Sequence, residues 1–186
     1  MKSNLERSYA RAVNAWCMYD WANSGFATTI MAAVLPTFYS EVAGATLDPV
    51  QASGYWGYTN TAAMLVVAFA APILGAIADH SGAKKRFLGG FAGLGILFTG
   101  LLVLVSTGDW LIASLFYILG RIGFSGSIVF YDALLPHVAR SDDIDQVSTK
   151  GFALGYLGGG LLLVINLAWI MEPAWFGLPN AEISSR

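Results

Sequence analysis

The sequence of 186 residues has few charged side chains, one cysteine and two histidines. Charged residues make up 12% of the chain, about half of the roughly one quarter that is typical of soluble proteins. Apolar residues make up 56%. This composition excludes an ordinary soluble domain and predicts a membrane protein, with the lipid bilayer as its surroundings. Because no block of basic residues occurs, we expect no nucleic-acid partner.

The scarcity of metal-binding and reactive side chains excludes several kinds of site. Cys17 has no second thiol to form a disulfide, a CxxC redox site or a zinc site. Neither His80 nor His137 has a second His, Cys or carboxylate at the spacing of metal ligands, and the acidic stretch 142–145 lacks the glycine and the distal Glu of an EF-hand. No Ser/Lys, Ser/His or paired-Asp arrangement is evident. We therefore expect no metal, no cofactor and no enzymatic activity, and an intramembrane enzyme is the weakest alternative.

Five apolar segments reach the length of about 20 residues that a helix needs to cross the hydrocarbon of a bilayer. We expect transmembrane helices at about 12–40, 55–78, 87–105, 110–136 and 151–171. The first is longer than the apolar part of a signal peptide and contains Asp20, so we expect it to stay uncleaved. The predicted fold is an all-α membrane protein with a single transmembrane domain, 1–186, whose segment 172–186 is a loop.

The basic residues lie in alternate connections. They are Lys2, Arg7 and Arg11 in the N-terminal tail, Lys84, Lys85 and Arg86 between the second and third helices, and Arg140 and Lys150 between the fourth and fifth. The connections 41–54 and 106–109 contain no Lys or Arg. By the positive-inside rule, the N-terminus and the two basic connections are predicted to face the cytoplasm.

Three ionisable side chains fall inside predicted spans, where each costs about 2.5–3.5 kcal/mol on insertion scales and therefore suggests a function. Arg121 follows Trp110 by 11 residues, or about 16 Å of helix, which places it near the midplane. Asp20 lies in the cytoplasmic half of the first helix, and Asp132 lies nearer the cytoplasmic end of the fourth. Helical spacing puts Asp20 and Asn23 on one polar face.

We expect the polar faces of the first and fourth helices to line a common aqueous cavity. The candidate substrate or ion pathway comprises Asp20, Asn23, Arg121 and Asp132. In this interpretation Arg121 binds a substrate carboxylate or lies beside a titrating acid, and Asp20 and Asn23 make polar or ion-coupling contacts. The alternative is that Arg121 and an acid form a satisfied pair that only fixes helix packing. Asn60 and Asn166 are expected only to bond a neighbouring helix.

Glycines at helical spacing form stripes of small residues that allow close helix packing. The predicted packing positions are Gly89 and Gly93, Gly120 and Gly123, and Gly151, Gly155 and Gly159.

One charged turn, Gly75-Ala-Ile-Ala-Asp79-His-Ser-Gly82-Ala-Lys84-Lys85-Arg86, separates the second and third predicted helices. It resembles the loop 2–3 signature of major facilitator superfamily transporters, with Gly75, Asp79 and Gly82 in register. The resemblance implies a conformational latch in which Asp79 caps or pairs with a neighbouring helix end in one access state. The latch residues are then Gly75, Asp79, Gly82, Lys84, Lys85 and Arg86.

Two other stretches, 19–26 and 130–136, together with 146–148 and 155–159, resemble the branch of the autophagy-related vacuolar amino-acid effluxers and their bacterial relatives. That resemblance implies secondary active transport of small solutes, amino acids among them, by alternating access, and a multi-pass protein of a bacterial plasma membrane. Arg121 resembles the helix 4 arginine of proton-coupled members, although Phe124 and Ser125 stand where Gln and Gly are expected. Protons are therefore the expected coupling ion.

Superfamily members have twelve helices in two halves, each half being two inverted three-helix repeats. The five helices predicted here correspond to an N-terminal half whose second repeat is incomplete. We therefore expect a transporter fragment that needs the missing C-terminal half. The alternative is a non-transport membrane scaffold, or a half-unit that assembles with a partner chain, and continuation of the reading frame would distinguish these hypotheses.

Overall fold

The computed structural model describes residues 2–80 and 82–176, and this part of the chain contains helices and no strand. The long helices are α1 (Lys2–Gly25), α3 (Pro49–His80), α4 (Lys84–Leu101), α5 (Trp110–Asp132) and α7 (Ile144–Met171). The short elements are α2 (Leu35–Phe38), α6 (Leu135–Val138), η3 (Leu102–Leu104) and η4 (Pro173–Phe176). The predicted loop 172–186 begins with the η4 turn, and its part beyond residue 176 lies outside the described residues.

Five helical stretches of the described chain are long and apolar enough to cross a membrane. They are Asn4–Ala43, Pro49–His80, Lys84–Leu104, Trp110–Asp132 and Ile144–Met171. They follow the order of the five predicted spans, so the all-α membrane fold is confirmed. Large apolar side chains such as Phe69 (77% exposed) and Tyr156 (80%) point outward, as expected where lipid replaces water.

The start of α7 and the end of α5 differ from the predicted helix ends. α7 begins at Ile144 rather than at residue 151, because hydropathy marks only the apolar part while the backbone hydrogen bonds continue beyond it. α5 ends at Asp132 rather than at residue 136. Pro136 instead lies in the first turn of α6, where its missing N–H leaves no helical bond unmade.

The first span changes its winding along its length. After α1 it continues as the π-helix η1 (Phe26–Val34), the short α2 and a second π-helix, η2 (Tyr39–Ala43). Pro36 lies between the two π segments and cannot donate an i→i−4 bond, which favours a local departure from α geometry. In the sequence, Pro36 lies near the end of the predicted helix 12–40. No sequence pattern predicts the π-helical segments η1 and η2.

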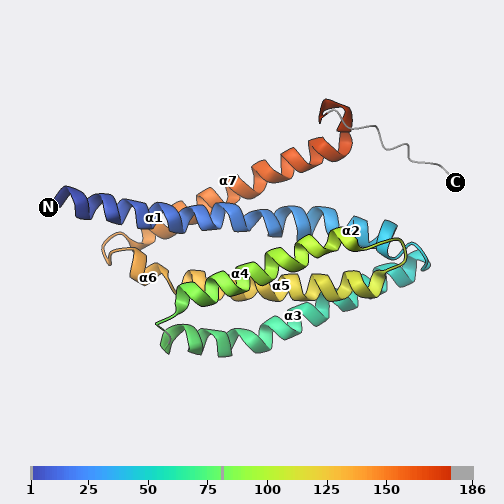
Figure 1. Ribbon diagram of the computed structural model, residues 1–186, viewed down its shortest axis with the longest axis horizontal. Coiled ribbons are helices and arrows are strands. Elements are labelled where there is room, and N and C mark those ends of the chain that lie inside the picture. The colour runs from blue at the N-terminus through green and yellow to red at the C-terminus, as the bar shows by residue number, and fades with distance from the viewer. Residues whose placement is uncertain (1, 81, 177–186) are drawn as a thin grey trace.

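Figure 1 shows a bundle of long, nearly parallel or antiparallel helices. α3 and α4 pack along α5, and α7 packs along α1. The turns that join α3 to α4 and α5 to α7 lie at the same end as the start of α1 (Figure 1). Consequently, the connections predicted to share the cytoplasmic side do lie together.

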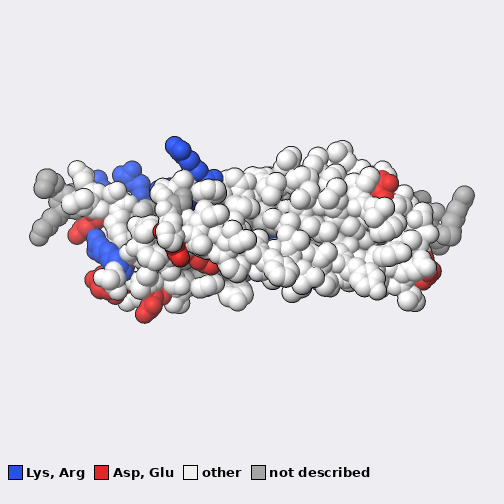
Figure 2. Space-filling model, turned by 90° about the horizontal axis from the view of Figure 1, so that it is seen from below, with Lys and Arg blue, Asp and Glu red and all other residues white. Residues whose placement is uncertain are grey.

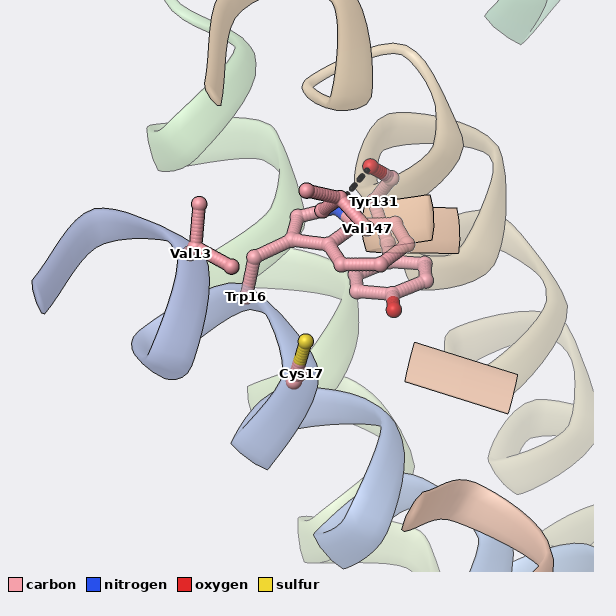
Figure 3. Packing of buried hydrophobic residues seen from close by; sticks show 5 residues of the cluster. All are labelled: Val13, Trp16, Cys17, Tyr131 and Val147. Atoms are coloured by element: carbon pink, nitrogen blue, oxygen red, sulfur yellow. Dashed lines mark hydrogen bonds between the residues drawn. The ribbon is translucent and has the colours of Figure 1, made fainter. Parts of the chain in front are cut away.

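A buried cluster fixes α1 to α5 and α7 at this end (Figure 3). The Trp16 indole stacks on the Tyr131 ring with centroids 4.3 Å apart, and its Nε1–H donates to the Tyr131 carbonyl at 3.1 Å. Val13, Cys17 and Val147 complete the cluster, and Cys17 is fully buried. The indole therefore gains both packing and a satisfied N–H.

Glycines allow the closest approach between α4 and α5. A Cβ added to Gly123 would lie 2.3 Å from the Gly95 nitrogen, and one added to Gly120 would lie 3.4 Å from Thr99 Oγ1. By contrast, no heavy atom lies within 4 Å of a Cβ added to Gly89 or Gly93 among the described residues. Within the described residues, α5 instead packs on Gly95, which lies about 200° around the helix from Gly93. The packing role of Gly89 and Gly93 stays a prediction.

The contact between α1 and α7 uses the glycines of α7. A Cβ added to Gly151 would lie 2.4 Å from the Trp16 ring, and one added to Gly159 would lie 3.0 Å from Thr28. Thr28 Oγ1 also donates to the Gly159 carbonyl at 3.0 Å. The stripe predicted on this helix thus lies at a helix contact, where its lack of side chains admits the larger residues of α1 and η1.

Charged side chains concentrate at the ends of the bundle. In the face shown in Figure 2, Lys and Arg gather at the end where α1 begins, and the far end shows only Asp and Glu. The belt between them is almost free of charge on this face (Figure 2). This distribution matches a bilayer-spanning protein with one basic side.

Candidate functional site

Arg121 is the middle residue of α5, which runs from Trp110 to Asp132. Its Nη1 donates to Asn60 Oδ1 on α3 at 2.5 Å and to the Tyr117 hydroxyl at 2.8 Å. The Tyr117 hydroxyl in turn donates to Asn60 Oδ1 at 3.0 Å. The three side chains form a closed triangle of hydrogen bonds between α3 and α5, and we call it the Arg121 triad.

The Arg121 triad contains no acid. Within residues 2–80 and 82–176, no carboxylate lies at ion-pair distance from Arg121, so the predicted alternative of a satisfied Arg–acid pair does not occur there. Both acceptors are neutral, and the positive charge is therefore not cancelled. A charge held by neutral acceptors in a low-dielectric span still attracts an anion strongly.

Aromatic side chains pack against the Arg121 triad on the side away from the basic end. The Trp56 ring lies 4.8 Å from the Tyr117 ring and 5.2 Å from the Tyr39 ring. Beyond them, Ser114 Oγ lies 2.8 Å from both the Tyr39 hydroxyl and Thr59 Oγ1. This network joins η2, α3 and α5, and it restricts the rotamer of Tyr117.

Asp20 lies elsewhere, between α1 and α7. It is 8% exposed, and the Ser24 hydroxyl donates to its Oδ1 at 3.4 Å. A Cβ added to Gly155 would lie 2.8 Å from its Oδ2, so the carboxyl group rests directly on the backbone of α7. A buried carboxyl with so few donors is expensive to ionise, and its protonation would change the contact between the two helices.

The predicted common cavity is only partly present. A cavity of about 470 Å³ lies between the first span, α4, α5 and α7, and Asn23 lines it. Asp20, Arg121 and Asp132 are not among its lining residues. Three of its buried hydroxyls, those of Tyr19, Thr29 and Thr99, have no hydrogen-bond partner among the described residues. The Asn166 side chain also borders it and donates to the Leu162 carbonyl at 2.8 Å.

Asp132 is the last residue of α5 and is exposed. It shares a helix face with Arg121, but 11 residues of helix separate them by about 16 Å. The two side chains therefore cannot act on one small group together. Among the described residues, no hydrogen bond joins any two of the four predicted pathway residues.

The turn 75–86 is joined to the end of α5. Lys84 Nζ donates to the Ala133 carbonyl at 3.3 Å and lies 2.9 Å from His137 Nε2. Asp79 is exposed in the last turn of α3, and Lys85 and Arg86 are exposed at the start of α4. Gly75 and Gly82 have no heavy atom within 4 Å of an added Cβ among the described residues. Of the predicted latch residues, Lys84 thus contacts the end of α5, whereas Asp79 is exposed.

Three further contacts at the basic end have no counterpart in the sequence patterns. The Tyr9 hydroxyl donates to Asp143 Oδ2 at 2.5 Å, and the Arg140 guanidinium lies 4.1 Å from the centre of the Tyr9 ring. Lys150 Nζ donates to Asn14 Oδ1 at 2.9 Å. These contacts bind the first turns of α1 to the start of α7. Single polar residues on separate helices give no periodic signal, so only the structure pairs them.

Comparison with known proteins gives two matches. Residues 45–176 match the family model described as vacuole effluxer Atg22 like. A curated relative from Bacillus subtilis (strain 168), described as the uncharacterized MFS-type transporter YxiO, is 39% identical over 168 residues. The aligned part covers 90% of this chain and 39% of that relative, so the chain spans about two fifths of the relative's length. No solved structure matches the chain significantly.

Proposed function

Because the chain belongs to the vacuole effluxer Atg22-like family, we propose that it is part of a secondary active transporter that moves amino acids across the membrane by alternating access. The single observation that carries this proposal is the Arg121 triad. A guanidinium in the middle of a span costs about 2.5–3.5 kcal/mol on insertion scales, and no acid among the described residues offsets it. Binding of a substrate carboxylate offsets this cost.

Asp20 supports protons as the coupling ion. Its carboxyl group is buried against Gly155, and protonation removes a charge that is expensive to bury. The protonated and ionised forms favour different contacts between α1 and α7, which is what a coupled helix movement requires. Asn23, one turn further along, lines the neighbouring cavity and is assigned to the same pathway.

The turn 75–86 is assigned the role of a latch between access states. Asp79 lies at the C-terminal end of α3, where a negative charge opposes the helix dipole by about 0.3–1 kcal/mol. The opposing charge is tolerated if a helix N-terminus or a cation from another part of the complete transporter meets Asp79 in one state. Lys84 meanwhile holds the turn to α5.

The protein is assigned to a bacterial plasma membrane with its N-terminus in the cytoplasm. The gathering of basic side chains at the end where α1 begins supports this orientation (Figure 2). The relative from Bacillus subtilis supports the compartment, because that organism's MFS-type transporter is similar over 90% of this chain.

The proposal is tested with the complete gene product in proteoliposomes. Uptake of a ¹⁴C-labelled amino-acid mixture is measured with and without a pH gradient. We expect uptake that the gradient increases, and Arg121→Ala should abolish it while the amount of inserted protein stays the same. Transport by the Arg121→Ala variant at the wild-type rate would mean that Arg121 serves only helix packing. If the native reading frame stops after Arg186 and the protein does not transport, the scaffold or half-unit is favoured instead.

A further inference from the structure

Asn60 is the neutral acceptor that holds Arg121. Its Oδ1 receives two hydrogen bonds, one from Arg121 Nη1 at 2.5 Å and one from the Tyr117 hydroxyl at 3.0 Å. A carbonyl oxygen has two lone pairs, so this acceptor is saturated. Asn60 belongs to α3 and Arg121 to α5, so the contact also fixes the guanidinium relative to a second helix.

The groups left over in the Arg121 triad are all donors. Arginine has five N–H groups and no acceptor, and only Nη1 donates hydrogen bonds to described residues. The three N–H groups on Nε and Nη2 remain, together with the amide N–H₂ of Asn60. Both side chains are partly exposed. A set of N–H donors with a net positive charge matches the two oxygens of a carboxylate, which arginine binds through paired hydrogen bonds.

We propose that Asn60 sets the charge and the orientation of a carboxylate-binding subsite at Arg121, an inference that rests on the proposed transport function. Asn60 positions Nη1 through a neutral oxygen, so the rest of the guanidinium keeps its full charge for the carboxylate of the solute. An aspartate at this position would make the same two hydrogen bonds, but it would neutralise the guanidinium and repel a second carboxylate. The amide is therefore a specificity-determining feature of the site.

A purely structural role makes the opposite prediction. If Asn60 only joins α3 to α5, then Asn60→Asp, which keeps both hydrogen bonds, is harmless, and Asn60→Ala, which loses them, is the damaging change. If Asn60 sets the charge, Asn60→Asp is the more damaging change and Asn60→Ala keeps an uncancelled Arg121. The order of the two variants thus decides between the roles, and each serves as the control for the other.

The experiment compares wild type, Asn60→Ala and Asn60→Asp as complete gene products. The transport probe is a ¹⁴C-labelled amino-acid mixture, with unlabelled amino acids or the corresponding amino-acid amides as competitors. For wild type we expect competition by the acids and not by the amides. For Asn60→Asp we expect KM to rise by about tenfold or more with kcat little changed, and for Asn60→Ala a rise of at most about threefold.

Binding without transport is measured in parallel as the melting temperature of each detergent-solubilised protein, with amino acids or their amides present. Stabilisation of wild type by the acids alone, lost in Asn60→Asp, supports the subsite even if no transport is seen, and then only the transport proposal fails. Wild-type KM in Asn60→Asp, or a larger defect in Asn60→Ala, overturns the subsite and leaves transport standing. Neither binding nor uptake of amino acids by wild type overturns both.

Discussion

Arg121 and the glycines of α5 show how single residues place functional groups inside a membrane. Arg121 has acceptors on its own helix, in Tyr117, and on α3, in Asn60. Gly123 brings α4 so close that a Cβ added there would lie 2.3 Å from the Gly95 nitrogen. A polar contact on one face of α5 and a glycine contact on another therefore fix its position between α3 and α4.

The glycine contact predicts an asymmetry between two substitutions on neighbouring helices. Gly123→Ala must push the backbone of α4 away, and overpacking of this kind costs about 1–3 kcal/mol. Gly93→Ala meets no described atom within 4 Å, so it should be neutral or stabilise by up to about 1 kcal/mol through helix propensity. SDS-induced unfolding in mixed micelles measures both. Equal stability of the two variants would contradict the close packing of α4 on α5.

The elements differ in how far the sequence predicted them. The five spans follow directly from apolar length, because a helix in lipid must satisfy its backbone internally. The π segments η1 and η2 were not predicted, since they depend on how the first span packs around Pro36. The faces of Asp20 and Arg121 could be read from helical spacing. Their partners could not, because periodicity on one helix does not say which residue of another helix meets it.

The helices that flank the turn 75–86 carry charges opposed to their dipoles. Asp79 lies near the C-terminus of α3, and the first turn of α4 begins with Lys84, Lys85 and Arg86. Both arrangements are unfavourable in isolation by a few tenths of a kcal/mol or more for each charge. Lys84 reduces the cost by donating to the Ala133 carbonyl, near the end of α5.

For this turn we predict that Asp79→Asn changes the balance between inward and outward access in the complete gene product. Removal of the charge takes away about 0.3–1 kcal/mol of differential interaction, so the ratio of the two states should change roughly two- to fivefold. Labelling of single cysteines from each side of the membrane measures the ratio. Asp145→Asn makes the same charge change at an exposed site in the first turn of α7 and is the control. Identical labelling in both variants would mean that the turn determines membrane topology and does not act as a latch.

At the scale of the whole molecule, the described chain is a bundle with one basic end and an apolar belt (Figures 1 and 2). The buried clusters divide along its length. One joins α1, α5 and α7 near Trp16, and another joins η2 and α5 near Tyr39. Each end of the bundle thus has its own packing, while the polar groups of the Arg121 triad lie between them.

The charge distribution predicts which connections a membrane-impermeant maleimide reaches in intact cells. A cysteine at Thr107, in the exposed connection before α5, should be labelled, whereas a cysteine at Lys85 should be labelled only after the cells are permeabilised. The native Cys17 is fully buried and should not react in either case. The reverse pattern would place the basic end outside and contradict the assigned orientation.

The contact between Asn60 and Arg121 also has a consequence for biosynthesis. Chains are made from the N-terminus, so α3 reaches the bilayer before α5 is complete. When the guanidinium of Arg121 enters the hydrocarbon, an amide oxygen on the earlier span α3 is therefore already present to accept its N–H. The same hydrogen bond that orients Arg121 in the finished bundle lowers the cost of inserting α5, the span that carries this cation.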